Sequence, residues 1–156
     1  MPPGQSAKHR SWQNARVTEL DEDVRSLLEG ANFAHVATVM PDGSPHSVAV
    51  WVGLEGDRIA FFTQSQSQKA KNLGRDPRLA ISITDHANPY RTARLRGRVV
   101  DTLEGDEALE VIDRLSERYT GAPFPMRSGT VYLVEPERVG FMELPFADKP
   151  GGEARA

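Results

Sequence analysis

Apolar and polar residues alternate through most of the middle of the chain, which is the pattern of strands with one buried face. Six strands are predicted, over residues 33–40, 45–54, 58–63, 78–84, 90–103 and 130–144. Short turns at 41–44 and 55–57 join the first three strands, and connections of this length require antiparallel neighbours. Pro136 lies inside the last predicted strand, so we expect a break there.

Three helices are predicted: one before the first strand, at residues 18–30, and two between strands, at 65–76 and 105–121. In the first helix, Thr18 followed by Asp21 resembles a capping box, and we expect the helix to stop at a glycine. The clearest helix is the last, in which one apolar face is formed by Ala108, Ile112, Leu115 and Tyr119. Antiparallel strands with short helices at the rim predict a mainly β (α+β) domain, a small closed barrel.

The length of 156 residues fits one domain, at 18–144, between a flexible N-terminal arm (1–17) and a flexible C-terminal tail (145–156). There are no cysteines, and the four histidines show no metal-ligand spacing, so we expect no metal site. A net charge of −3 argues against nucleic-acid partners. Neither a membrane-spanning run nor a secretory apolar stretch is present, so we expect a cytoplasmic protein without a membrane partner.

One stretch of this acidic chain is strongly basic. Residues 69–98 contain only Asp76 and Asp85 as acids, against Lys69, Lys71, Arg75, Arg78, Arg91, Arg94, Arg96 and Arg98. Because side chains alternate along a strand, the last three arginines share one face of the 90–103 strand. A solvent face or a subunit contact accounts for them better than direct ligand binding, although such a patch would attract a small polyanion.

The best candidate site lies where the third predicted strand meets the second helix. A helix N-terminus carries a partial positive charge and unpaired N–H groups, and anions bind there. Thr63 and Ser67 offer hydroxyls, Lys69 a full charge and Asn72 an amide, which together favour a phosphate. The alternative is simple N-capping by Ser67, a favoured cap with or without a ligand. A lysine in the first turn points to an anion, because the helix dipole disfavours a cation there.

Two other residues are weaker candidates. His46, on the second strand, could face a ligand, but a surface position is the favoured interpretation. Trp51 could stack on a ring system, but a tryptophan in a strand more often belongs to the core. No acid–base pair suited to catalysis stands out, so no catalytic residue is predicted from the residues alone.

Three stretches in this order, "FAHVATVMPDGSPHSVAVWV", "RIAFFTQSQSQKAKNLGRDPRLAISI" and "NPYRTARLRGRVV", resemble the split β-barrel flavoproteins of the pyridoxamine-phosphate-oxidase-like superfamily. The resemblance covers about residues 18–143 and is strongest to the branch that uses the deazaflavin coenzyme F420 in place of FMN. It implies a six-stranded antiparallel split β-barrel with short peripheral helices, and a homodimer with two cofactor sites at the subunit interface.

The resemblance also implies roles for particular residues. Lys69 matches the family's phosphate-binding lysine, and the residues around it would assist. The segment from Ser47 to Val50 matches the strand along the cofactor ring, and Tyr90 and Arg91 match a segment that completes the site from the second chain. The implied cofactor-binding residues are Ser47, Val48, Ala49, Val50, Thr63, Ser67, Gln68, Lys69, Asn72, Tyr90 and Arg91.

Departures from the family pattern narrow the choice between the two cofactors. Pyridoxamine phosphate oxidases have arginines where this chain has Ser47 and Gln68, and they end in an Arg-x-His motif that this chain lacks. Pyridoxal phosphate synthesis is therefore not expected. FMN carries a phosphomonoester with a charge near −2, whereas F420 carries a singly charged phosphodiester and a glutamate tail. One lysine and a helix terminus suit the single charge better.

The resulting hypothesis is an F420-dependent oxidoreductase that transfers a hydride between the deazaflavin and a small conjugated or unsaturated substrate. An FMN-dependent oxidoreductase of the same fold is one alternative. The other is a binding protein that holds a cofactor or tetrapyrrole in the same cleft without turnover. Tyr90, Arg91 or solvent could supply a proton, and the sequence does not choose among them.

Overall fold

The structure is a computed structural model and describes residues 19–146. The expected arm, Thr18 and all but two residues of the expected tail lie outside this range. The described elements are α2 (Glu22–Glu29), β1 (Ala34–Val39), β2 (Pro45–Val50), β3 (Gly53–Glu55), β4 (Arg58–Thr63), α3 (Gln68–Arg75), β5 (Arg78–Thr84), β6 (Arg91–Leu103), α4 (Gly105–Thr120) and β7 (Thr130–Glu143).

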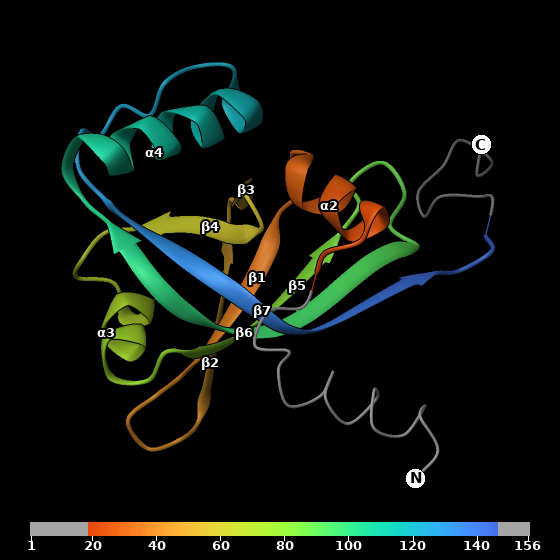
Figure 1. The fold of residues 1–156 in the computed structure, drawn as a ribbon, viewed down its shortest axis with the longest axis horizontal. Coiled ribbons are helices and arrows are strands. Elements are labelled where there is room, and N and C mark those ends of the chain that lie inside the picture. The colour runs from red at the N-terminus through yellow and green to blue at the C-terminus, as the bar shows by residue number, and fades with distance from the viewer. Residues whose placement is uncertain (1–18, 147–156) are drawn as a thin grey trace, which may run out of the picture.

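The strands form one antiparallel sheet in the order β2-β1-β5-β6-β7-β4-β3, curled as Figure 1 shows. Its two edge strands, β2 and β3, follow one another in the chain, with only Trp51 and Val52 between them. The mainly β (α+β) prediction is confirmed, but the barrel is not closed: the sheet has two edges. The strand count was also wrong, because the predicted 45–54 strand is two strands, one at each edge.

A tyrosine on α4 holds the junction between these edges. The hydroxyl of Tyr119 accepts a hydrogen bond from the backbone N–H of Val52 at 3.1 Å and donates to the carbonyl of Asn32. Its ring stacks on Trp51, with centroids 5.2 Å apart. Trp51 also meets Phe62 and Phe124 edge to face. The core interpretation of Trp51 is therefore correct, and its ring is committed to this aromatic cluster.

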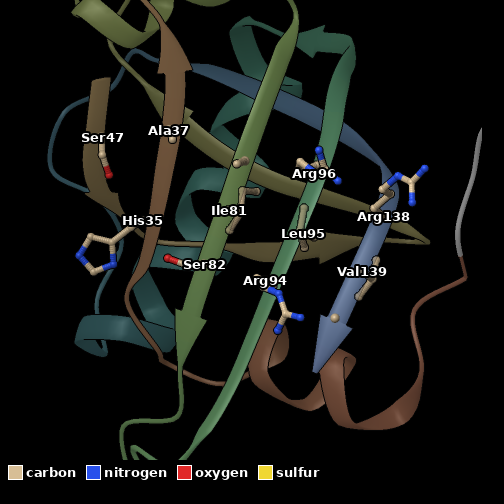
Figure 2. Close-up of a pocket in the computed structure, with 12 residues that line it drawn as sticks. His35, Ala37, Ser47, Ile81, Ser82, Arg94, Leu95, Arg96, Arg138 and Val139 are labelled. Carbon is tan, nitrogen blue, oxygen red and sulfur yellow. The ribbon is translucent and has the colours of Figure 1, made fainter. Parts of the chain in front are cut away.

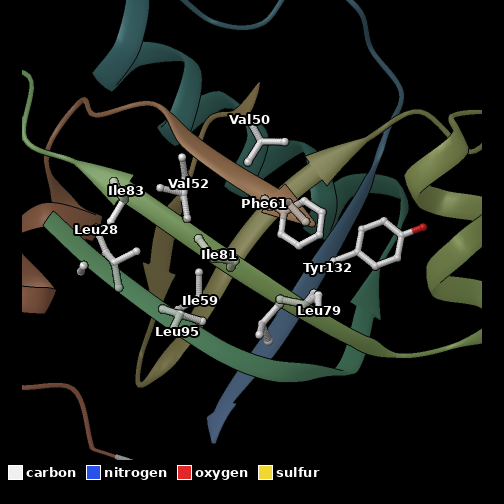
Figure 3. Close-up of a cluster of buried hydrophobic side chains, with 14 of the residues drawn as sticks. Leu28, Val50, Val52, Ile59, Phe61, Leu79, Ile81, Ile83, Leu95 and Tyr132 are labelled. Atoms are coloured by element: carbon white, nitrogen blue, oxygen red, sulfur yellow. The ribbon is translucent and has the colours of Figure 1, made fainter. Parts of the chain in front are cut away.

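The main core lies inside the curled sheet and includes the buried side chains of α2. Every strand except β3 contributes fully buried or nearly buried side chains to it, and Phe61 and Tyr132 stack at 5.4 Å within it (Figure 3). A second apolar cluster lies under α4 and contains Ala108, Ile112 and Leu115, three of the four residues assigned to that face. Tyr119, the fourth, is half-buried.

Two local details differ from prediction. Asp21 is itself the N-cap of α2: its carboxylate accepts from the N–H of Val24 at 3.0 Å, so the helix begins later than the capping-box prediction placed it. Pro136 does not break β7. The irregularity is a shift in register against β6 at Arg96 and Gly97, and Gly97 pairs with Pro136 there. The bulge accommodates the missing proline N–H without ending the strand.

Gly97→Ala is expected to destabilise the fold, because an added Cβ would lie 2.3 Å from the backbone carbonyl oxygen of Glu135. Overpacking of this kind costs about 1–3 kcal/mol. Gly74→Ala is the matched control, since no heavy atom lies within 4 Å of its added Cβ, and alanine in a helix is worth up to about 1 kcal/mol over glycine. Urea unfolding that shows equal stability for the two variants would contradict the crowded bulge.

Candidate cofactor site

The start of α3 is built by two hydroxyls. The Thr63 Oγ1 hydroxyl, at the end of β4, donates to Ser67 Oγ at 2.8 Å, and Ser67 Oγ accepts from the N–H of Ala70 at 3.2 Å. Ser67 is therefore the N-cap of α3, and its own hydroxyl hydrogen stays available as a donor. Ser67 does cap the helix, as the simpler interpretation proposed, and the phosphate role stays a prediction.

Lys69 lies in the first turn of α3, where the helix dipole opposes a positive charge. It is half-buried, and burial lowers the pKa of its ammonium group. Within residues 19–146, no carboxylate or other acceptor pairs with that ammonium. The backbone N–H groups of Gln68 and Lys69 likewise have no acceptor in this range. The N-terminal corner of α3 therefore presents one positive charge without a counter-charge and two backbone N–H groups without acceptors among the described residues.

Asn72 points into the protein and attaches α3 to β1. It is fully buried, and its Nδ2 donates to Thr38 Oγ1 at 3.0 Å and to Met40 Sδ at 3.4 Å. Its Oδ1 accepts from Gln68 Nε2 at 2.9 Å. Both amides of α3 are thus used inside the chain, so the structure gives Gln68 and Asn72 a role in positioning the helix. Their direct contact with a cofactor stays a prediction.

The predicted ring-binding segment is β2, an edge strand of the sheet. Val48 and Val50 point inward against the core, while Ser47 and Ala49 are exposed on the outer face. Because β2 has a neighbour on one side only, alternate residues present an N–H and a C=O that no strand in the described sheet pairs. Ser47 to Val50 can therefore offer backbone groups and two small side chains to a flat ligand.

Tyr90 and Arg91 lie at the far end of the sheet from α3. Arg91 opens β6 near the Ala34 end of β1, whereas Asn72 attaches α3 near the opposite end of β1, at Thr38. Arg91 forms ion pairs at 3.1–3.3 Å with Asp23, Asp85 and Glu143. One chain does not bring this segment to Lys69, so any shared site requires a second chain.

The outer face of the sheet is hollowed beside β2. A depression of about 430 Å³ is lined by His35, Ala37, Ser47, Ala80, Ile81, Ser82, Arg94, Leu95, Arg96, Arg138, Val139 and Gly140 (Figure 2). The predicted alternation of β6 is confirmed, with arginines at 94, 96 and 98 exposed and Ala93, Leu95 and Gly97 buried. Sequence reasoning had singled out Ser47, Arg94 and Arg96. It missed the remaining lining residues, because they come from four strands and meet only through the sheet register.

His46 is not the surface residue that was favoured. It is half-buried, and its Nδ1 is shielded from solvent with no hydrogen-bond partner in the described range. It pairs across the strands with Thr38, the residue that anchors Asn72. In residues 19–146 no group of three His, Asp or Glu side chains is arranged to hold a metal ion. None of the described helices is long and apolar enough to cross a membrane.

Comparison with known proteins identifies the family. A family model described as Pyridoxamine 5'-phosphate oxidase matches residues 20–143. The chain therefore belongs to the pyridoxamine 5'-phosphate oxidase family.

Three known proteins illustrate which members of the family this chain is similar to. The F420H(2)-dependent biliverdin reductase of Mycobacterium tuberculosis is 33% identical over 126 residues, covering 79% of this chain and 88% of that protein. A solved structure of an F420 reductase has 31% identity and a TM-score of 0.68, covering 78% of this chain and 98% of the other. The pyridoxine/pyridoxamine 5'-phosphate oxidase of Cupriavidus taiwanensis is 32% identical over 89 residues, 56% of this chain and 41% of that protein.

Lys69→Met is expected to stabilise the ligand-free protein by a few tenths to about 1 kcal/mol, because it removes an unpaired charge from the positive end of a helix. The gain should shrink at high pH. A lysine with a lowered pKa in the folded state destabilises that state while charged, so wild-type stability rises as the pH approaches 10.5. Lys71→Met, an exposed lysine of the same helix, is the control. Urea unfolding in which Lys69→Met loses stability would mean that the ammonium has a partner in the free protein.

Proposed function

We propose that this protein is an oxidoreductase that uses F420 and transfers a hydride between the deazaflavin and a small conjugated or unsaturated organic substrate. The observation that carries the proposal is the unbalanced positive corner at Lys69. An anion bound there would relieve the conflict with the helix dipole and satisfy two free amides at once. The names of the two F420-linked relatives support the choice of coenzyme.

The residues at the corner fit a phosphodiester. The Lys69 ammonium, the N–H groups of Gln68 and Lys69, and the free hydroxyl hydrogen of Ser67 are all donors. Thr63 donates to Ser67 and so orients that hydroxyl. Among the described residues at this corner the full charge comes from Lys69, and the family resemblance implies arginines in place of Ser47 and Gln68 where a phosphomonoester is bound. A single negative charge is the better match.

The ring would lie along β2, where Ser47 to Val50 offer unpaired backbone groups and small outward side chains. When bound, F420 supplies the hydride chemistry at its ring. The chain's own contribution is to hold the two flat molecules in contact and to exclude water. Tyr90 and Arg91 would complete the site from the partner in a homodimer, since one chain holds them at the far end of the sheet.

Two alternatives have specific support. FMN remains the second candidate coenzyme, because the family model and the Cupriavidus relative are pyridoxamine 5'-phosphate oxidases. A carrier without turnover is the other, because the described residues near β2 contain no evident acid–base pair. Absorbance titration of the protein with F420 and with FMN distinguishes the coenzymes, and tighter binding of FMN would refute the proposed cofactor.

Lys69→Ala is expected to weaken F420 binding about 10- to 150-fold, the equivalent of about 1.5–3 kcal/mol for a hydrogen bond to a charged group. Lys71→Ala, two residues further along the helix and exposed, keeps the helix and loses the same formal charge, so it should change affinity less than threefold. Isothermal calorimetry measures both. Equal losses in the two variants would show that Lys69 contributes only to the general field and makes no contact.

Turnover is expected when the protein carrying reduced F420 meets a conjugated acceptor. The oxidised coenzyme should reappear in the absorbance spectrum, and Lys69→Ala should lower the rate at subsaturating coenzyme while saturation restores it. A panel of enones, quinones and tetrapyrroles provides the acceptors. A protein that binds F420 tightly and oxidises it with none of them behaves as a carrier.

A further inference from the structure

His46 is a polar side chain that the proposed site does not yet use. It leaves β2 on the same inward face as Val48 and Val50, and it is half-buried. Its Nδ1 is shielded from solvent, and within residues 19–146 neither nitrogen of the ring has a hydrogen-bond partner. Buried polar atoms in proteins almost always have a partner, so the unpaired ring of His46 requires an explanation.

The shielded nitrogen indicates where the proton of the neutral ring lies. A neutral imidazole has one N–H donor and one acceptor nitrogen. Among buried backbone groups, a donor without an acceptor is rarer than an acceptor without a full set of donors, and the same preference places the proton of His46 on Nε2. Nε2 also lacks a partner among the described residues but is not shielded. His46 therefore presents an N–H donor that a ligand can reach.

His46 lies where the open edge of the sheet meets α3. Its cross-strand neighbour is Thr38, whose hydroxyl oxygen accepts a hydrogen bond from Asn72 of α3 at 3.0 Å. The N-terminus of the same helix is attached to β4, because Thr63 donates to the N-cap Ser67 at 2.8 Å. The helix thus extends from the last residue of β4 to the strand beside β2, and it closes one end of the opening between the sheet edges.

Two stretches of free strand edge border this opening. β2 pairs with β1 alone, and β3 pairs with β4 no further than Ala60, so residues 61–63 of β4 pair with β7 alone. The two-residue crossing from β2 to β3 keeps these edges next to each other. His46, near the start of β2, lies at the end of the opening that α3 covers.

This position falls between the two parts of the coenzyme in the proposed complex. The ring would lie along the unpaired edge of β2 at Ser47–Val50, directly after His46 in the strand. The phosphate would lie at Lys69, one helical turn before Asn72. Flavin and deazaflavin coenzymes join ring and phosphate through a short carbon chain that carries hydroxyl groups. That polyol chain would pass the α3 end of β2, and its hydroxyl oxygens accept hydrogen bonds from N–H donors.

We infer that His46 binds the polyol chain of the coenzyme, through a hydrogen bond from its Nε2–H to a hydroxyl oxygen. The inference rests on the proposed function, because it takes the positions of ring and phosphate from it. F420 and FMN both carry the polyol, so the contact does not depend on which of the two is bound. His46 positions the coenzyme and takes no part in the hydride step.

Three ligands separate the parts of the coenzyme: F420, its dephospho form with only ring and polyol, and the same ring with a methyl group in place of the polyol. His46→Leu is expected to weaken F420 and the dephospho form by the same factor, about 3- to 10-fold, and to leave the methyl compound unchanged. Lys69→Ala should weaken F420 alone. Fluorescence titration measures the three affinities.

Two further variants are the controls. His46→Gln keeps an N–H donor of similar reach and should bind F420 within threefold of the wild type. His86→Leu removes an exposed histidine that follows β5, at the end of the sheet away from α3, and should change none of the affinities. In urea unfolding, His46→Leu should be at least as stable as the wild type, because the replacement removes a polar atom that has no partner among the described residues.

Nitrogen NMR of the histidine rings tests the same contact in the unmodified chain. The free protein should show His46 protonated at Nε2, and that signal should shift when the dephospho form binds and stay in place with the methyl compound. A ring protonated at Nδ1, or a signal that no ligand moves, contradicts the contact.

Four results of the titrations and unfolding would overturn the inference. Equal F420 affinity in the wild type and His46→Leu removes the contact. A loss that extends to the methyl compound assigns His46 to the ring, and a loss confined to F420 assigns it to the phosphate. A less stable variant that binds all three ligands more weakly shows that the histidine only supports the fold.

The proposed function fails separately from this result. Riboflavin keeps the polyol of FMN, and lumiflavin lacks it. A protein that binds FMN more tightly than F420, and in which His46→Leu weakens FMN and riboflavin but spares lumiflavin, refutes the coenzyme assignment and keeps the role of His46. A protein that binds F420 through Lys69 and is indifferent to His46 keeps the proposed function and loses this contact.

Discussion

The arrangement depends on the hydroxyl of Tyr119, which bonds to the chain where the sheet leaves one edge and begins the other. Val52 N–H donates to it, and it donates to the carbonyl of Asn32, while the ring covers Trp51. These contacts pin the two-residue crossing between β2 and β3. Since the crossing is fixed to α4, the two edges do not pair and β2 keeps one side free. The predicted cofactor strand is exposed for that reason.

Hydrogen bonding of polar side chains also determines the geometry at the start of α3. A small helix is attached to β1 by one buried amide, that of Asn72, which Gln68 supports from one turn earlier. Both side-chain amides of the helix that point inward find partners within the chain, as buried polar groups usually do. Lys69 is left facing outward at the wrong end of a helix dipole. A charged residue that costs stability and has no partner within residues 19–146 is typical of a binding residue.

Positive charge is concentrated on the outer face of β6. The chain carries a net charge of −3, but the outer face of β6 is positive because the alternation over residues 93–98 exposes Arg94, Arg96 and Arg98 and buries the residues between them. An acidic partner neutralises one end of this face, where Arg98 pairs with Glu137. Within residues 19–146 no acidic side chain pairs with Arg94 or Arg96, so the positive charge of this face is concentrated beside the small side chains of β1 and β5.

The sequence alone determined the features that depend on local spacing. The alternation along β6, the last helix with its apolar face, the cap at Ser67 and the cationic first turn of α3 all follow from residues within a few positions of one another, where propensity and periodicity act. Only the tertiary structure decided the break at Trp51, the inward use of Asn72, the ion pairs of Arg91 and the surface that joins Ser47 to Gly140. These depend on register between strands far apart in the chain and on which buried group finds a partner, and neither is encoded in a local pattern.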